Sequence, residues 1–214
     1  MFENPWSSDG WSKHVKTEVI KYWTKLLKES AASYPSLEMV DINHLKLTSP
    51  HAIWKEAGSN PVSVTKTTVV TWLLLGVYKT GERLHKMKKV RTPQCLVCFS
   101  PLEDQLHFAL QCSGLIEIRT QYMNKFVEAC PNIAYYQSDL KLLLLALLDP
   151  FSTFLPDNIK ESWTKPEIAY ELSRNYFYDL HKKREKLIEA TLTKQTQPEI
   201  EDETQIIISV YEHI

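Results

Sequence analysis

Residues 95–112 read CLVCFSPLEDQLHFALQC, which places three cysteines and one histidine in the spacing C-x2-C-x8-H-x4-C. Zn²⁺ favours four thiolate or imidazole ligands arranged as a tetrahedron. The two-residue gap between Cys95 and Cys98 allows a tight turn to direct both sulfurs to one point, and a second element must then supply His107 and Cys112. The stretch therefore predicts a small CCHC zinc-binding module embedded in the chain.

A helix from Pro101 to Cys112 would supply the second pair of ligands. Ser100 has the residue type of an N-cap, a proline suits the first helical position, and Glu103 completes a capping box. His107 would then lie in the middle of the helix and the last cysteine at its end. Positions five apart lie about 140° apart around an α-helix, so we expect the last turn to open when both residues bind one metal.

Two other interpretations of these residues remain open: unligated thiols in a core with a satisfied histidine, and redox or disulfide chemistry. The chain has four cysteines and no signal-peptide pattern, so we expect a nuclear or cytoplasmic protein that is not secreted. A redox Cys-x2-Cys usually follows a strand, whereas a basic, turn-rich segment precedes Cys95. The fourth cysteine, Cys130, is expected to be a small buried hydrophobic residue.

The predicted zinc is structural, because four protein ligands leave no open position for water or substrate. A zinc deaminase would place His-x-Glu before the Cys-x2-Cys, and here the histidine follows the cysteines. The chain has no Asp-Asp pair, no glycine-rich phosphate loop and no Gly-x-Ser-x-Gly motif. We therefore expect no catalytic activity and no small-molecule substrate.

A run of cations precedes the zinc pattern and is opposed in sequence only by Glu82. Its members, predicted as nucleic-acid contacts, are Lys79, Arg83, Lys86, Lys88, Lys89 and Arg91. Clustered cations beside a metal-stabilised turn suit the fixed negative charge of a phosphate backbone. A solvated helix face is the alternative, and the net charge of -1 means that any attraction to nucleic acid must be local.

Five pieces of sequence surround the zinc pattern in a recognisable order. They are Trp72–Tyr78 (WLLLGVY), Cys95–Cys98, Glu103-Asp104, His107–Cys112 (HFALQC) and Leu115–Arg119 (LIEIR). In this order the segment from Val69 to Asn132 resembles the C-terminal region of reverse transcriptases from non-LTR retrotransposons, particularly the jockey-like elements. The chain departs from the family pattern at Leu75, where threonine is common, and at Leu96-Val97, where Pro-Leu is usual. Neither departure touches a ligand.

The resemblance implies that Cys95, Cys98, His107 and Cys112 bind zinc in a module that handles RNA or DNA. It does not imply polymerase activity, because the catalytic aspartates are missing and 214 residues cannot hold the palm and fingers as well. We therefore expect a nucleic-acid-binding C-terminal fragment of an RNA-directed DNA polymerase that lacks the polymerase core. The alternatives are a structural-zinc module for protein interaction, and a retroelement relic without nucleic-acid binding.

The remaining sequence predicts a mainly α-helical fold without a membrane span. Expected helices cover residues 12–31, 61–78, 115–130, 140–148 and 166–193. We divide the chain into an N-terminal helical region (1–78), a basic linker with the zinc module (79–132), C-terminal helices (133–193) and a flexible acidic tail (194–214).

Two expectations concern single side chains. Trp11, Trp23 and Trp54 are expected in the core rather than on a base-stacking surface, because they lie far apart in sequence. The cations from Lys182 to Lys186 are expected to complement the dipole at the end of the last helix, with a second phosphate contact as the alternative.

Overall fold

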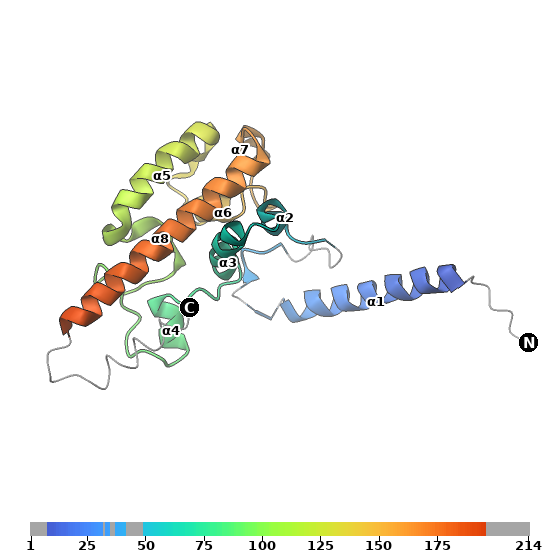
Figure 1. Cartoon of the computed structure of the whole chain (residues 1–214), viewed down its shortest axis with the longest axis horizontal. Coiled ribbons are helices and arrows are strands. Elements are labelled where there is room, and N and C mark those ends of the chain that lie inside the picture. Colours follow the sequence, from blue (N-terminus) through green and yellow to red (C-terminus); the bar gives the residue numbers. More distant parts are fainter. Residues whose placement is uncertain (1–7, 32, 35–36, 42–48, 196–214) are drawn as a thin grey trace, which may run out of the picture.

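The computed structural model describes residues 8–31, 33–34, 37–41 and 49–195, and these residues form helices and turns without a strand. The mainly α-helical fold class is thereby confirmed. Short 3-10 and π segments separate some of the helices (Figure 1). The α-helices are α1 (Ser8–Ala31), α2 (Ala52–Ala57), α3 (Pro61–Leu74), α4 (Gly81–Lys86), α5 (Ile116–Ala129), α6 (Leu140–Leu148), α7 (Asp157–Ser162) and α8 (Pro166–Gln195).

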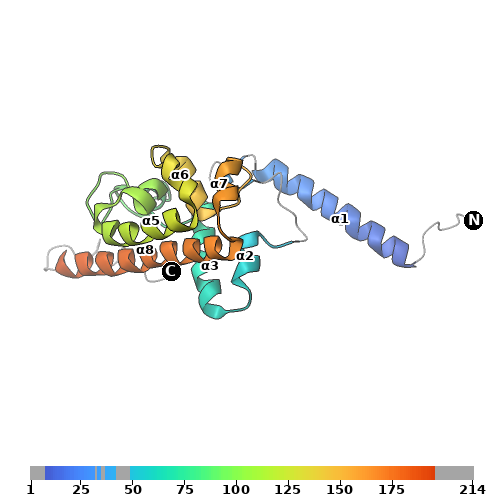
Figure 2. The same cartoon turned by 90° about the horizontal axis from the view of Figure 1, so that it is seen from above.

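The long helix α8 runs through the helical body and packs against both α3 and α5 (Figure 1, Figure 2). Its buried face carries Tyr176, Phe177 and Leu180. The ring of Tyr176 lies edge-on to Phe126 of α5, with 5.6 Å between the ring centroids, and its hydroxyl donates to the carbonyl of Ala109 at 2.5 Å. One side chain of α8 therefore joins α5 to the segment that carries the predicted zinc ligands.

The helix α6 is a buried apolar helix, as its sequence LKLLLLALL predicts. Asp139 caps it by accepting a hydrogen bond from the amide of Leu142 at 3.0 Å, and residues 143–148 are all buried. Residues 143–148 offer no polar face to water, so this part of α6 lies inside the body, whereas Lys141 in the first turn is exposed.

The predicted second helix forms, with Asn60 as its cap, but it ends at Leu74 rather than at Tyr78. Gly76 adopts a φ of 63°, and the amides of the two residues that follow it both donate to the carbonyl of Trp72. The chain turns sharply here, which glycine allows because it has no β-carbon. The turn places Tyr78 in the core, at 3% exposure.

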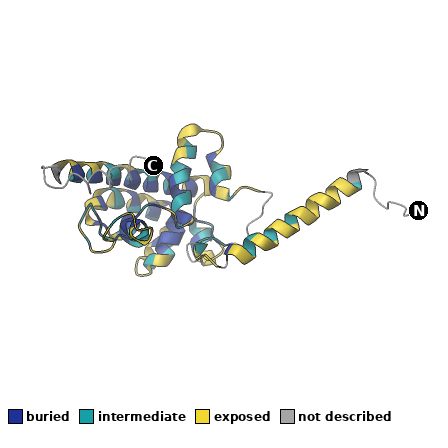
Figure 3. Ribbon diagram, turned by 90° about the horizontal axis from the view of Figure 1, so that it is seen from below, coloured by how far each residue is buried: buried dark blue, intermediate teal, exposed yellow. Residues whose placement is uncertain are grey.

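The helix α1 projects from the helical body, and most of its surface is exposed (Figure 2, Figure 3). It begins at Ser8 rather than at the predicted Ser12. Trp11 and Trp23 are 53% and 54% exposed, so the expectation that they lie in the core is wrong for these two, whereas Trp54 of α2 packs against the core. The reason is physical: an amphipathic pattern states which face of a helix is apolar, but a packing partner decides whether that face is buried.

The predicted zinc module is packed into the same core as the helices. Cys95 and Cys112 belong to one buried cluster with Leu73 of α3 and Leu144 of α6. Within the described ranges, no helix is both long and apolar enough to cross a membrane. From residue 196 onward the predicted acidic tail lies outside the described residues, and the division of the chain into four regions stays a prediction.

Candidate metal centre

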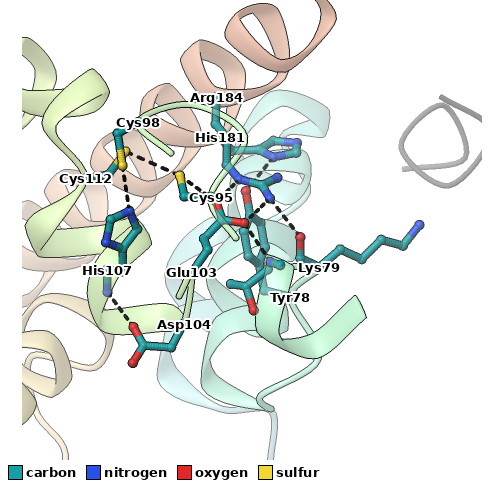
Figure 4. Close-up of polar contacts among 12 residues, drawn as sticks. Tyr78, Lys79, Cys95, Cys98, Glu103, Asp104, His107, Cys112, His181 and Arg184 are labelled. Carbon is teal, nitrogen blue, oxygen red and sulfur yellow. Dashed lines mark hydrogen bonds and ion pairs between the residues drawn. The ribbon is translucent and has the colours of Figure 1, made fainter. Parts of the chain in front are cut away.

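Cys95, Cys98, His107 and Cys112 come together in one cluster, in which one ligand atom from each residue lies within 4.8 Å of the others. The sulfur of Cys98 lies 3.2 Å from Nε2 of His107, and the sulfurs of Cys95 and Cys112 lie 3.9 Å apart (Figure 4). Cys98 is half-buried and the other three residues are buried. This cluster could hold a metal ion.

Backbone hydrogen bonds close the turn that carries the first two cysteines. The amide of Phe99 donates to the carbonyl of Cys95, and the amide of Cys95 donates to the carbonyl of Ser100, both at 2.9 Å. Phe99 adopts a left-handed φ of 61°, which tightens the turn. Gly114 packs directly on this turn, because a β-carbon at that position would lie 2.4 Å from Cγ1 of Val97.

The helix predicted from Pro101 to Cys112 starts later than expected, after Asp104. The carboxylate of Asp104 accepts a hydrogen bond from the amide of His107 at 2.7 Å and so acts as the cap. The predicted capping box is wrong, because the carboxylate of Glu103 binds partners from other elements instead. Local sequence could not reveal this, since those partners lie far away in the chain.

The segment His107–Gln111 forms a π-helical turn. The amide of Cys112 donates to the carbonyl of His107 at 2.7 Å, which is the five-residue hydrogen bond of a π-helix. This wider turn brings the two ligands to one side, whereas an α-helix would separate them by about 140°. The predicted opening of the last turn thus takes the form of a regular π-turn.

The ionisable groups of the cluster affect one another. Burial lowers the pKa of His107, which favours the neutral imidazole that a metal needs as a ligand. A hydrogen bond from Cys95 lowers the pKa of Cys112, and the same hydrogen bond, together with burial, raises the pKa of Cys95. The two thiols are thus in hydrogen-bond contact, and binding of a metal ion would displace their protons.

The donor set suits zinc. A tetrahedral site with Zn–S bonds of about 2.3 Å separates two sulfurs by about 3.8 Å, and the two buried sulfurs lie 3.9 Å apart. Thiolate and imidazole ligands also favour zinc over magnesium or calcium, which prefer oxygen. Cys130 lies outside the cluster: it is fully buried, and its sulfur is hydrogen bonded to the hydroxyl of Ser162 at 3.0 Å.

A buried ion pair that sequence reasoning missed adjoins the cluster (Figure 4). Nε and Nη2 of Arg184 donate to the two carboxylate oxygens of Glu103, at 2.7 and 2.8 Å, and the two side chains are 1% and 2% exposed. The expectation that Arg184 complements the dipole at the end of α8 is therefore wrong, because its guanidinium is buried against Glu103 and α8 continues to Gln195. A signal existed, because Arg184 follows Tyr176 and Leu180 at four-residue steps and so lies on the apolar face of α8.

Four of the predicted nucleic-acid contacts are exposed near the metal loop, which we define as residues 95–112. Lys86 ends α4, and Lys88, Lys89 and Arg91 lie in the turn that follows it. Lys86 forms an ion pair with Glu82 at 2.6 Å, so part of its charge is already balanced.

The other two predicted contacts are only partly exposed. Arg83 lines a groove of about 600 Å³ together with Lys141 of α6 and the metal-loop residue Asp104. Lys79 is half-buried, and its carbonyl accepts a hydrogen bond from Arg184 at 3.1 Å. The six cations therefore do not form one uniform surface.

Acidification is expected to destabilise the protein through His181, which lies beside Arg184 of the buried Glu103–Arg184 ion pair. Burial lowers the pKa of His181 from its ordinary value of 6.5 to about 4, and the ring contacts Tyr78 and Glu185. Because the folded state binds fewer protons than the unfolded state between these pH values, stability falls as the pH decreases from 6.5 to about 4, by up to about 3 kcal/mol. Urea denaturation across this range should show a shallower pH dependence for His181→Gln; equal slopes in both proteins would contradict the assignment.

The four side chains of the cluster are enough to fill a tetrahedral metal site. No protein-family model, curated protein or solved structure matches this chain.

Proposed function

We propose that this chain is a zinc-stabilised module that binds RNA or DNA through the cations beside its metal centre. The observation that carries the proposal is the exposure of Lys86, Lys88, Lys89 and Arg91 next to the metal loop. Exposed lysine and arginine side chains on a rigid support neutralise phosphates and release condensed counterions. Zinc has a structural role in this proposal, and the chain itself has no catalytic role.

The resemblance to the C-terminal region of non-LTR retrotransposon reverse transcriptases supports the same proposal. In that setting the module would hold template or target nucleic acid for a polymerase core that this chain lacks. The net charge of -1 is not an obstacle, because phosphate contacts act over a distance of about 10 Å at ordinary salt concentrations and depend on local charge.

Removal of the four exposed positive charges beside the metal loop is expected to lower the affinity for nucleic acid and to make that affinity less dependent on salt. The variant Lys86→Gln/Lys88→Gln/Lys89→Gln/Arg91→Gln should reduce the slope of log affinity against log salt by about 3, since each neutralised phosphate contributes about 0.7–0.9. Fluorescence anisotropy with a labelled single-stranded RNA and its DNA equivalent, over a series of salt concentrations, measures this slope.

The matched control removes the same amount of charge from α1. Lys13→Gln/Lys16→Gln/Lys21→Gln/Lys25→Gln should leave the slope unchanged, because these lysines lie on the projecting helix rather than beside the metal loop. An equal loss in both variants would mean that net charge, and not the predicted surface, governs binding.

A second candidate function is a protein-interaction module whose fold is held together by zinc. The exposed apolar side chains of α1 favour it, since Trp11, Tyr22 and Trp23 are each more than half exposed. The absence of binding to either oligonucleotide at low salt, in protein that contains zinc, would favour this second function over the first.

A further inference from the structure

The buried carboxylate of Glu103 connects three parts of the molecule that are separate in sequence (Figure 4). The backbone amide of Glu103 donates to the carbonyl of Pro93, just before the metal loop, at 2.8 Å. Oε1 of Glu103 lies 3.8 Å from the sulfur of Cys95, within that loop. From α8, Arg184 donates two hydrogen bonds to the Glu103 carboxylate. From α4, the amide of Gly81 donates to its Oε2 at 2.7 Å.

The start of α4 depends on Glu103 for hydrogen-bond acceptors. The first amides of a helix have no partners within the helix. Here the amide of Gly81 donates to the Glu103 side chain, and the amide of Glu82 donates to the Glu103 carbonyl at 3.0 Å. The hydroxyl of Thr80 accepts from the amide of Arg83 at 3.3 Å. The metal loop therefore supplies acceptors that a local cap usually provides.

The start of α4 also packs directly against the segment that enters the metal loop. A β-carbon on Gly81 would lie 2.7 Å from the carbonyl oxygen of Gln94 and 2.8 Å from that of Pro93. Cys95 follows this segment immediately. The start of α4 and the entry to the metal loop are therefore in direct contact.

We propose that Glu103 is a positioning residue that couples metal binding to the placement of α4 and of the basic segment after it. A bound metal holds Cys95 and with it the loop that carries Glu103. The carboxylate and the backbone carbonyl of Glu103 then both face the start of α4. Without the metal, the four ligand side chains lose their common partner, and the amides of Gly81 and Glu82 lose their fixed acceptors. Only the effect on nucleic-acid affinity rests on the proposed function; the coupling to α4 does not.

Hydrogen exchange in the intact chain tests the coupling directly. Zinc, compared with chelator, is expected to slow exchange of the Gly81 and Glu82 amides by at least about tenfold more than that of the Phe126 amide in α5. In Glu103→Gln the additional protection of the Gly81 amide is expected to disappear while the protein still binds zinc, because the glutamine side chain has one acceptor oxygen where the carboxylate offers two to Arg184 and Gly81. The Glu82 amide keeps its backbone acceptor in this variant. An equal effect of zinc at α4 and α5 in the unsubstituted chain would overturn the proposal, and this comparison suffices even if the variant does not fold.

A matched control separates positioning from general destabilisation. Asp179→Asn makes the same change from carboxylate to amide at another contact of α8, where Tyr122 of α5 donates to Asp179 at 2.5 Å. This variant is expected to keep the zinc-dependent protection at Gly81 and Glu82. Loss of that protection in Asp179→Asn would overturn the special role of Glu103.

Nucleic-acid affinity provides the second measurement. Chelation is expected to weaken binding of a single-stranded RNA oligonucleotide by about tenfold or more in the unsubstituted chain, and by about twofold or less in Glu103→Gln. The same chelation effect in both proteins would overturn the coupling. Zinc-dependent protection at α4 without RNA or DNA binding would support the coupling and overturn the proposed function, so the two failures are distinguishable.

Discussion

Replacement of Cys98 by serine is expected to reduce bound zinc from one ion per chain to near zero and to destabilise the metal loop. The four ligand atoms lie within 4.8 Å of one another, so removal of one thiolate leaves an incomplete tetrahedron. A metal present at about 1,000 times its dissociation constant stabilises the fold by about 4 kcal/mol, and its loss lowers the midpoint of thermal unfolding by about 8–16 °C. Elemental analysis and thermal unfolding measure the two effects.

Cys130→Ser is the matched control for this prediction. Cys130 is fully buried, as Cys95 and Cys112 are, but it lies outside the cluster, and its sulfur is hydrogen bonded to Ser162. A serine hydroxyl can form the same hydrogen bond, so this variant is expected to keep its zinc. Loss of zinc from Cys130→Ser, or full zinc content in Cys98→Ser, would contradict the ligand set.

Arg184→Ala is expected to cost about 3–5 kcal/mol of unfolding free energy, since it leaves the Glu103 carboxylate buried without its charged partner. The guanidinium also lies over the rings of Tyr78 and Phe108, at 5.7 and 6.0 Å, so packing between α8 and the metal loop is lost with it. Urea denaturation of the zinc-loaded protein measures the change in unfolding free energy.

Two further variants distinguish a buried pair from an ordinary surface contact. Lys182→Ala removes the exposed partner of Glu185 on the same helix and should cost about 1 kcal/mol or less. Glu103→Gln/Arg184→Met removes both buried charges and should recover a substantial part of the loss. A cost of Arg184→Ala no greater than that of Lys182→Ala would contradict the importance of this ion pair.

The metal cluster could be predicted from sequence because tetrahedral coordination requires particular residue types at short spacings. All four residues of the C-x2-C-x8-H-x4-C pattern lie together as that spacing predicts. The burial of helix Leu140–Leu148 could also be predicted, because a segment with almost only apolar side chains is stable in water only inside a core. Both the metal cluster and the buried helix depend on residues that are close together in the sequence, so both can be predicted from a short segment.

The geometry of the second ligand pair was only partly readable. Helical spacing showed that His107 and Cys112 would not share one face of an α-helix, but it could not show that a π-turn solves this problem. The residue types at Ser100 and Glu103 also fit a capping box, but the helix starts after Asp104, so no capping box forms there. A side chain such as that of Glu103 can bind either nearby backbone amides or partners that are distant in sequence. Here it binds Arg184 and the amide of Gly81.

By itself, then, the sequence determined which residues can bind a metal and which helix faces are apolar, because both follow from residue chemistry at short range. Only the tertiary structure decided what those faces and charges meet. It left the apolar face of α1 exposed, and it brought Glu103 to Arg184 across 81 positions of the chain. Burial of a charge is stable only when its partner arrives through packing, and no local pattern specifies a contact at that separation.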